Sequence, residues 1–159
     1  MLKIILVVVV LGVAGLLVYI RLAPSDPARW HIDIAAADFI PPAHWAAYCP
    51  DPARQTFATF TAVAPLARLA DIADSWPRTT RVAGSVEDGR ITWLTRSRIL
   101  GFPDYATAAQ IQTPNGPAVC IVSRQRFGTE DGGVNAARLR GWLMRAFGAD
   151  APPELVWNP

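Results

Sequence analysis

The apolar and polar positions of this chain divide it into three stretches of different pattern. Residues 4–20 form an unbroken apolar run, in which 13 of 17 side chains are Leu, Ile or Val. Residues 22–54 are rich in proline and alanine and keep neither a helical nor an alternating period for long. From about residue 65 to residue 147, helical and strand-like patterns follow one another. The pattern therefore predicts an apolar helix, a connecting arm and one folded domain.

The first stretch has the length and composition of a transmembrane helix. Residues 2–20 span about 28 Å, which is close to the thickness of the hydrocarbon core of a bilayer. The 13 Leu, Ile and Val side chains favour insertion by roughly 4 to 8 kcal/mol. Lys3 and Arg21 bracket the run, and Tyr19 lies where an interfacial aromatic is expected. We predict a membrane anchor over residues 1–21 that holds the protein in the lipid bilayer.

A cleaved signal peptide is the alternative to a retained anchor. Its apolar region normally has about 7 to 15 residues and ends in a small-residue cleavage site. Here the run is longer, and its exit reads Arg21-Leu22-Ala23-Pro24, which is a poor cleavage site. We therefore expect a single-pass protein of the bacterial inner membrane. Because an N-terminal tail this short usually stays in the cytoplasm, we expect the C-terminal domain in the periplasm.

The second stretch, residues 22–54, carries scattered aromatic side chains without a periodic pattern. They are Trp30, Phe39, Trp45 and Tyr48. We interpret the stretch as a membrane-proximal arm whose aromatics pack on the domain. An aromatic binding groove is the alternative function for the same residues.

The third stretch predicts a helix, four strands and a second helix. The first helix runs from Pro65 to Trp76, with a proline at its first position and Pro77 after its end. The predicted strands are residues 78–86, 90–98, 104–112 and 117–126. The last helix runs from Asn135, a good N-cap, to Phe147, before Gly148.

Two dipeptides predict how the strands connect. Asp88-Gly89 and Asn115-Gly116 favour type I′ turns, which need positive φ at both central positions. The sheet is therefore predicted to be a four-stranded antiparallel meander with two helices on one face, which is an α+β fold of two layers. This domain covers residues 55–149, and residues 150–159 form a C-terminal tail.

Composition and charge exclude several classes of function. The net charge is only +2, so we expect no nucleic acid as a partner. Fourteen of the 15 basic residues are arginine, which favours bidentate anion contacts but also follows from a GC-rich genome. Cys49 and Cys120 stand 71 positions apart, without a second metal ligand at zinc-site spacing. They are expected either to form a disulfide or to pack as two buried thiols, and no metal or cofactor is expected.

Charged side chains gather where the predicted meander brings three strand ends together. Arg96, Arg98, Arg124 and Arg126 are the candidate residues for binding an anion or a partner protein. The same corner contains a second set of polar residues, which are Asp104, Asp131, Asn135 and Arg138. For this set we expect a structural network that ties the last helix to the sheet edge, with Asp131 as the acidic partner of Arg138. We also expect nearby arginines to lower the pKa of Asp104 and of Asp131.

The residues of this corner resemble the domain-of-unknown-function family 1499. The resemblance rests on Arg96-Ser97-Arg98, Gly101-Phe102-Pro103-Asp104-Tyr105, Ser123-Arg124-Gln125-Arg126-Phe127-Gly128, Asp131-Gly132-Gly133-Val134-Asn135 and Arg138. It covers roughly residues 62–147, with Gln125 where a serine is common between the two arginines. It implies a bacterial envelope protein with a membrane anchor, and it implies no activity.

No sequence signature of an enzyme is present. The chain has no nucleophile elbow, P-loop, dinucleotide fingerprint or metalloprotease motif. We therefore expect a non-enzymatic envelope domain that binds an anionic small molecule or an envelope protein at the arginine-rich sheet edge. One alternative is a membrane-tethered hydrolase or transferase that uses Asp104 or Asp131. Another is a purely structural subunit of a membrane complex.

Overall fold

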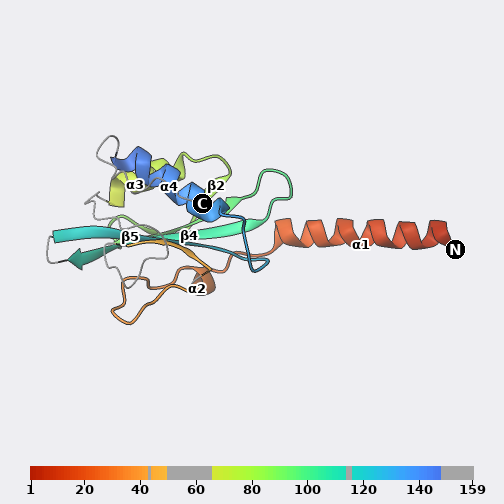
Figure 1. The fold of residues 1–159 in the computed structure, drawn as a ribbon, viewed down its shortest axis with the longest axis horizontal. Helices are drawn as coiled ribbons and strands as arrows, with labels where there is room; N and C mark the ends of the chain where they lie inside the picture. The colour runs from red at the N-terminus through yellow and green to blue at the C-terminus, as the bar shows by residue number, and fades with distance from the viewer. Residues whose placement is uncertain (43, 50–65, 114–115, 148–159) are drawn as a thin grey trace.

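The computed structural model describes residues 1–42, 44–49, 66–113 and 116–147. Within these ranges a long N-terminal helix leads into a sheet with helices packed on it (Figure 1). The elements are α1 (Leu2–Leu22), α2 (Pro27–Trp30), β1 (Ala46–Tyr48), α3 (Leu66–Asp74), β2 (Thr79–Ser85), β3 (Arg90–Arg96), β4 (Pro103–Thr113), β5 (Gly116–Gln125) and α4 (Val134–Phe147). The predicted residues Pro65, Asn115 and Gly148 and the tail at 150–159 lie outside the described residues.

The sheet is antiparallel throughout, with the strand order β1-β5-β4-β3-β2. The neighbours β2, β3, β4 and β5 form the predicted meander, so the α+β class and the meander are confirmed. Long β4 and β5 pair along their whole length, from Asp104↔Gln125 to Thr113↔Gly116. The register of this central pair determines which side chains of β4 and β5 lie on the same face of the sheet.

The sheet has five strands, and the prediction of four was wrong. The extra strand, β1, belongs to the proline-rich arm and pairs with β5 through Ala47↔Val122 and its two neighbours. It has only three residues, and all three are buried. A strand of this length with both faces covered shows no alternation, so its pattern in the sequence does not reveal it. Only the distant pairing with β5 defines it.

The connection from β2 to β3 is longer than predicted. Ser85 pairs with Arg90, so four residues form the loop. Gly89 has a positive φ of 70°, but Asp88 does not, and the turn is therefore not type I′. The Ser85 hydroxyl accepts a hydrogen bond from the Asp88 backbone N–H at 3.1 Å and lies 2.9 Å from its carboxylate. This local bonding stabilises the wider loop.

The two faces of the sheet are covered by different parts of the chain. Helices α3 and α4 pack on one face, as predicted, and we call it the helix face; α2 and the arm cover the other, the arm face (Figure 1). On the helix face the rings of Trp93 and Trp142 meet edge to face at 5.7 Å. On the arm face the rings of Trp30 and Tyr105 stack at 3.7 Å. Each face therefore has its own aromatic core.

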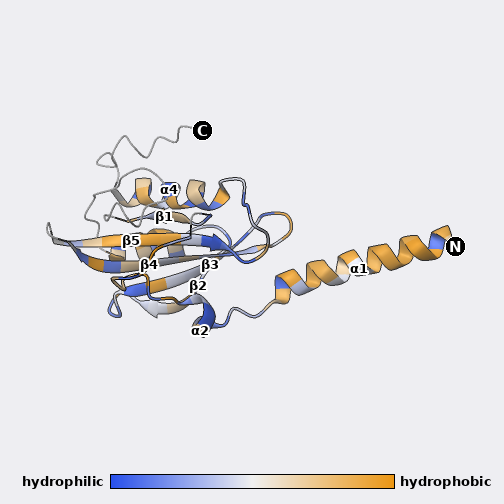
Figure 2. Cartoon of the chain, turned by 60° about the horizontal axis from the view of Figure 1, so that its bottom comes forward, coloured by the Kyte–Doolittle hydropathy of each residue, from blue (hydrophilic) through white to orange (hydrophobic). Residues whose placement is uncertain are grey.

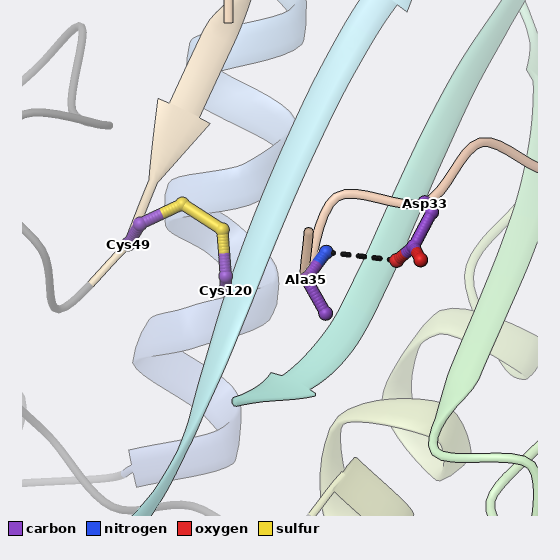
Figure 3. The surroundings of a disulfide bond; sticks show 4 residues. All are labelled: Asp33, Ala35, Cys49 and Cys120. Carbon is purple, nitrogen blue, oxygen red and sulfur yellow. Dashed lines mark hydrogen bonds between the residues drawn. A yellow bond between two sulfur atoms is a disulfide. The ribbon is translucent and has the colours of Figure 1, made fainter. Parts of the chain in front are cut away.

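The arm is further attached to the sheet by a disulfide. Cys49 follows β1 and is bonded to Cys120 on the neighbouring β5 (Figure 3). A short turn lies nearby, in which Asp33 accepts a hydrogen bond from the backbone N–H of Ala35 at 3.1 Å. Of the two states open for the cysteines, the structure has the disulfide. It closes a loop of 71 residues between the arm and β5.

Helix α1 is long and apolar enough to cross a membrane. Its surface is apolar nearly all round, in contrast to the mixed surface of the rest of the chain (Figure 2). Its 21 residues span about 32 Å at 1.5 Å per residue. Only its last turn contacts the domain, where Ile20 is buried and the ring of Tyr19 meets that of Phe127 at 6.1 Å.

Candidate functional site

The register of β4 and β5 divides the predicted corner between the two faces of the sheet. Asp104 is opposite Gln125 and Tyr105 is opposite Arg124. Because neighbouring residues of a strand point to opposite faces, Asp104 and Arg124 lie on different sides of the sheet. Asp104 contacts Arg138 of α4 on the helix face, whereas Arg124 contacts Trp30 of the arm. Asp104 and Arg124 thus lie at the same end of the sheet but on opposite faces, so the predicted site residues do not form one cluster.

On the helix face, a polar network joins α4 to the sheet. Arg138 forms an ion pair with Asp104 at 3.3 Å and donates to the Ser123 hydroxyl at 3.0 Å. Arg138 and Ser123 both donate to the side-chain oxygen of Asn135. All four side chains are buried. The expected network exists here, but the acidic partner that pairs with Arg138 is Asp104 and not Asp131.

The carboxylate of Asp131 caps the N-terminus of α4 and does not pair with Arg138. One of its carboxylate oxygens accepts from the Gly133 N–H at 2.9 Å, and the other accepts from the Asn135 N–H at 2.8 Å. The helix begins at Val134, so Asn135 lies in its first turn. The prediction of Asn135 as N-cap was therefore wrong. Its side chain is directed to the sheet, and the carboxylate of Asp131 satisfies the free backbone N–H groups instead.

Burial dominates the electrostatics of this network. It raises the pKa of Asp104, and the charge of Arg138 offsets only part of that effect. Burial likewise lowers the pKa of Arg138, against the opposing effect of Asp104. A neighbouring arginine, Arg138, does lower the pKa of Asp104, but the expected net decrease was wrong, because desolvation of the carboxylate is the larger effect.

On the arm face, Arg124 is enclosed by aromatic rings. Its guanidinium carbon lies 5.2 Å from the ring of Trp30 and 4.7 Å from the ring of Trp45. It donates to the Trp30 carbonyl at 2.8 Å, and only 5% of its surface is exposed. Burial lowers its pKa to about 10, so the side chain remains charged at neutral pH. Arg124 therefore anchors the arm from a position that a dissolved anion does not reach.

Arg126 lies just beyond the end of β5 and contacts the same arm. It donates to the Pro24 carbonyl at 2.7 Å, and its guanidinium carbon lies 5.4 Å from the ring of Phe127. Tyr105 connects this point to the arm again, since its hydroxyl lies 2.8 Å from that of Ser25. Arg126 is partly exposed. Its hydrogen bond to the Pro24 carbonyl attaches the segment between α1 and α2 to the end of β5.

Arg96 and Arg98 both belong to the predicted strand 90–98, but β3 ends at Arg96. Arg98 is exposed in the loop from 97 to 102. Arg96 lines a cavity of about 410 Å³ at the end of the sheet nearest α1. The lining residues of this arginine cavity are Arg21, Arg78, Thr79, Thr80, Arg96, Ser97 and Gly101. Of the four candidate arginines, only Arg96 lines it.

Arg21 and Arg78 were not among the predicted site residues. Arg21 donates to the carbonyls of Ile99 and Leu100 at 2.9 and 3.3 Å, which places the end of α1 against the loop. Glycine at 101 favours the close approach, because its φ is 76° and an added Cβ would lie 3.0 Å from the Arg21 side chain. A basic residue next to the membrane anchor was the sequence signal for Arg21. No sequence pattern marks Arg78.

Arg78 is held in an unusual backbone conformation. Its φ of 59° makes it the one residue other than glycine with a positive φ in the described part of the chain. Its carbonyl accepts from the Arg96 N–H at 3.0 Å, and its Nε donates to the Arg96 carbonyl at 3.1 Å. Such backbone strain costs about 1 to 3 kcal/mol and gathers at functional sites. The paired hydrogen bonds fix both arginines beside the cavity.

A second cavity, of about 290 Å³, opens on the helix side of the same end. It is lined by Ser97, Phe102, Asp104, Gln125, Phe127, Glu130, Asp131 and Val134. Its charged side chains are carboxylates, whereas those of the arginine cavity are guanidinium groups. Among the described residues, no group of three potential ligands is arranged to hold a metal ion. Opposite charges therefore line two neighbouring hollows, and Ser97 belongs to both.

Comparison with known proteins assigns the chain to a family but not to a function. The profile of the family described as "Protein of unknown function (DUF1499)" matches residues 21–146. The match confirms the resemblance found in the sequence, and its first residue is Arg21. No curated protein and no solved structure matches the chain significantly.

Proposed function

The chain belongs to the DUF1499 family of proteins of unknown function, and from its geometry we propose a membrane-anchored, non-enzymatic domain that binds an anionic group. The observation that carries the proposal is the arginine cavity, in which Arg21, Arg78 and Arg96 meet from three separate parts of the chain. Guanidinium groups bind phosphate and carboxylate through two parallel hydrogen bonds. An anion is therefore the ligand that matches this cavity best.

The charges of the cavity lack acidic partners in the described part of the chain. The ion pairs found there involve other arginines, namely Arg81, Arg90 and Arg138. The side-chain hydrogen bonds of Arg21, Arg78 and Arg96 within the described residues go to backbone carbonyls, and these use only some of the five N–H donors of each guanidinium. Positive charge and free donors are thus both left for a ligand.

The end of α1 supports a retained anchor over a cleaved signal peptide. Tyr19 and Ile20 pack on the domain, and Arg21 donates two hydrogen bonds to the 97–102 loop. Cleavage beyond Ala23 would remove all of these contacts and one wall of the cavity. The family match also includes Arg21. These contacts support the proposal that α1 stays attached to the domain and spans the membrane.

The disulfide supports a periplasmic domain. Cys49 and Cys120 are fully buried and bonded, and structural disulfides persist in oxidising compartments such as the bacterial periplasm. The cytoplasm would keep the two thiols reduced. The proposal therefore places the domain on the periplasmic side of the inner membrane.

A thermal-shift measurement on the full chain in a neutral detergent tests the anion site. Inorganic phosphate and citrate are the probes, and the variants are Arg96→Gln and Arg68→Gln. Arg68 is an exposed arginine of α3, so its variant changes the charge equally without touching the cavity. We expect phosphate or citrate to raise the melting temperature of the wild type and of Arg68→Gln but not of Arg96→Gln. Equal shifts in all three proteins contradict the proposal.

A hydrolase or transferase is the second candidate, because one observation favours it. Asp104 lines the second cavity, the one with carboxylate side chains. Burial raises the pKa of its carboxyl group, as a general acid requires. Its ion pair with Arg138 and the capping role of Asp131 weigh against this function. Turnover of a phosphate ester or acyl ester that is lost in Asp104→Asn would support it. No ligand and no turnover would favour a purely structural subunit.

A further inference from the structure

The loop from 97 to 102 has an apolar tip that contacts the end of α1. Ile99 and Leu100 are 79% and 42% exposed, and the exposed Arg98 precedes them. The loop connects β3 to β4 and projects from the end of the sheet nearest α1 (Figure 1). Exposed aliphatic side chains next to a cation are typical of segments that lie in the interface of a bilayer.

The depth of this tip follows from its contact with α1. Arg21 lies in the last turn of the helix, directly after the apolar run, and so belongs at the headgroup level. Because Arg21 donates to the Ile99 and Leu100 carbonyls, the tip lies at the same level. Neither residue has to move far to reach the acyl chains beside α1.

The base of the loop holds the tip in place. The Ser97 N–H donates to the Phe102 carbonyl at 2.9 Å, and the Phe102 N–H donates to the Ser97 hydroxyl at 2.9 Å. Arg96 also donates to the Gly101 carbonyl at 3.1 Å. The tip is therefore presented by a closed loop whose base forms part of the arginine cavity.

The cavity thus opens where the headgroups of the surrounding lipids lie. Its guanidinium groups are suited to a phosphate, and the phosphodiesters of the bilayer are the phosphates nearest to Arg21. We propose that the anion in the arginine cavity is the headgroup phosphate of an anionic phospholipid, and that Ile99 and Leu100 insert into the bilayer beside it. This inference rests on the proposed anion site and names its ligand.

The insertion of the tip is tested in nanodiscs that hold the full chain in mixed phosphatidylcholine and phosphatidylglycerol. Ile99→Cys is labelled with an environment-sensitive fluorophore, and the control is Glu87→Cys, an exposed position in the β2–β3 loop at the opposite end of the strands. We expect nitroxide-labelled acyl chains to quench the probe at 99 and not the probe at 87. Equal quenching of both probes by aqueous iodide, with none from the lipid nitroxide, overturns the insertion.

The identity of the ligand is tested by native mass spectrometry of the protein released from the same nanodiscs. We expect the wild type to retain about ten times as much phosphatidylglycerol as Arg96→Gln. This ratio corresponds to the loss of one charge-assisted hydrogen bond. Arg78→Gly provides a second cavity variant, and Arg68→Gln is the charge-matched control. All four proteins are first compared by thermal unfolding, so that a loss of lipid in a folded variant is assigned to the cavity.

Free phosphate separates the failure of this inference from that of the proposed function. If the full chain in detergent binds inorganic phosphate in an Arg96-dependent manner but all variants retain phosphatidylglycerol equally, the ligand is a soluble phosphate and the lipid inference is overturned. If neither phosphate nor phosphatidylglycerol depends on Arg96, both proposals fail. Selective retention of phosphatidylglycerol supports both.

Discussion

Arg124 and Arg138 are buried arginines that hold the domain together in different ways. Arg138 is paired with a carboxylate, whereas Arg124 lies between the rings of Trp30 and Trp45 and donates to a carbonyl. Removing a buried side chain of this kind leaves a space and an unpaired polar group. These residues are therefore expected to determine stability, in contrast to the arginines of the cavity.

The variant Arg124→Ala tests this division. We expect it to lower the free energy of unfolding by about 3 kcal/mol, because the Trp30 carbonyl loses its donor and the two rings lose their shared contact. The measurement is urea unfolding followed by tryptophan fluorescence. Arg68→Ala is the control and is expected to change stability by less than about 0.5 kcal/mol. Similar values for the two variants would refute the anchoring role of Arg124.

His31 makes the stability of the arm depend on pH. Its Nδ1 lies 2.9 Å from the Thr92 hydroxyl, and its Nε2 accepts a hydrogen bond from Arg90 at 3.1 Å. Burial, followed by the charge of Arg90, lowers the pKa of His31 below 6.5, while Asp88 and Asp33 oppose this. In the window just below 6.5 the unfolded chain therefore binds more protons, and stability rises with pH.

The expected result is a contribution of His31 that is complete above about pH 6.5 and is lost as the pH falls below it. Urea midpoints of wild type and His31→Gln, measured at neutral pH and near pH 5, check this. The difference between the two proteins should shrink at the lower pH, because protonation removes the acceptor for Arg90. A difference that grows on acidification would show that the sign is reversed.

At the scale of elements, β1 and its disulfide join the arm to the sheet. The strand has only three residues, and its pairing with β5 is continued by the bond between Cys49 and Cys120. A cross-link that closes a loop of 71 residues stabilises a fold by about 4 kcal/mol through the entropy of the unfolded chain. We expect the packing of the arm on the sheet to depend on this disulfide more than the stability of the meander does.

The double variant Cys49→Ser with Cys120→Ser should therefore lose about 4 kcal/mol of stability relative to the oxidised protein. Calorimetry on both proteins measures the loss, and addition of dithiothreitol to the wild type should reproduce it. If reduction leaves the melting temperature unchanged, the cross-link carries no stability and β1 is held by the aromatic contacts of the arm alone.

Elements with a strong local pattern could be predicted, and those defined by distant contacts could not. The four strands of the meander lie within two residues of their predicted bounds, and so do the ends of α3 and α4 that fall among the described residues. β1 was missed because three buried residues show no period. The loop before β3 was predicted too short, because the bond between Ser85 and Asp88 competes with the turn preference of Asp88-Gly89.

The candidate site shows the same limit. The sequence marked Arg96 through its place in a family motif, but it gave no reason to join Arg96 to Arg21 and Arg78. Those three residues meet only through the docking of α1 and the closure of the loop at Gly101. The strands 104–112 and 117–126 were predicted, yet without their register the sequence did not show that Asp104 and Arg124 lie on opposite faces.

At the scale of the whole molecule, the proposed anion site is complete only if α1 remains part of the mature protein. The last turn of α1 forms contacts with the domain, and Arg21 lines the arginine cavity. Intact-mass analysis of the protein from bacterial membranes should give a chain that contains all of α1. A mature N-terminus at or beyond Ala23 would show that the helix is a signal peptide, and the cavity would then lose one of its arginines.

The two ends of the domain differ in what they carry. The apolar helix and the 97–102 loop lie at the same end of the domain (Figure 1), and Arg21 and Arg96 of the arginine cavity belong to that end. Cys120 lies further along the sheet, since it is opposite Ala109, five pairs from the Asp104↔Gln125 end. Under the proposed function, the end of the domain that carries α1 faces the membrane and binds an anion in the arginine cavity.

The variant Arg78→Gly tests that claim most directly, because it separates binding from folding. Glycine adopts a positive φ without strain, and this relief offsets the lost hydrogen bond to Arg96, so stability should change by no more than about 1 kcal/mol. Isothermal titration calorimetry of the full chain with inorganic phosphate should show binding to the wild type and at least about tenfold weaker binding to Arg78→Gly. Equal affinity of the two folded proteins for phosphate would show that the arginine cavity is not an anion site.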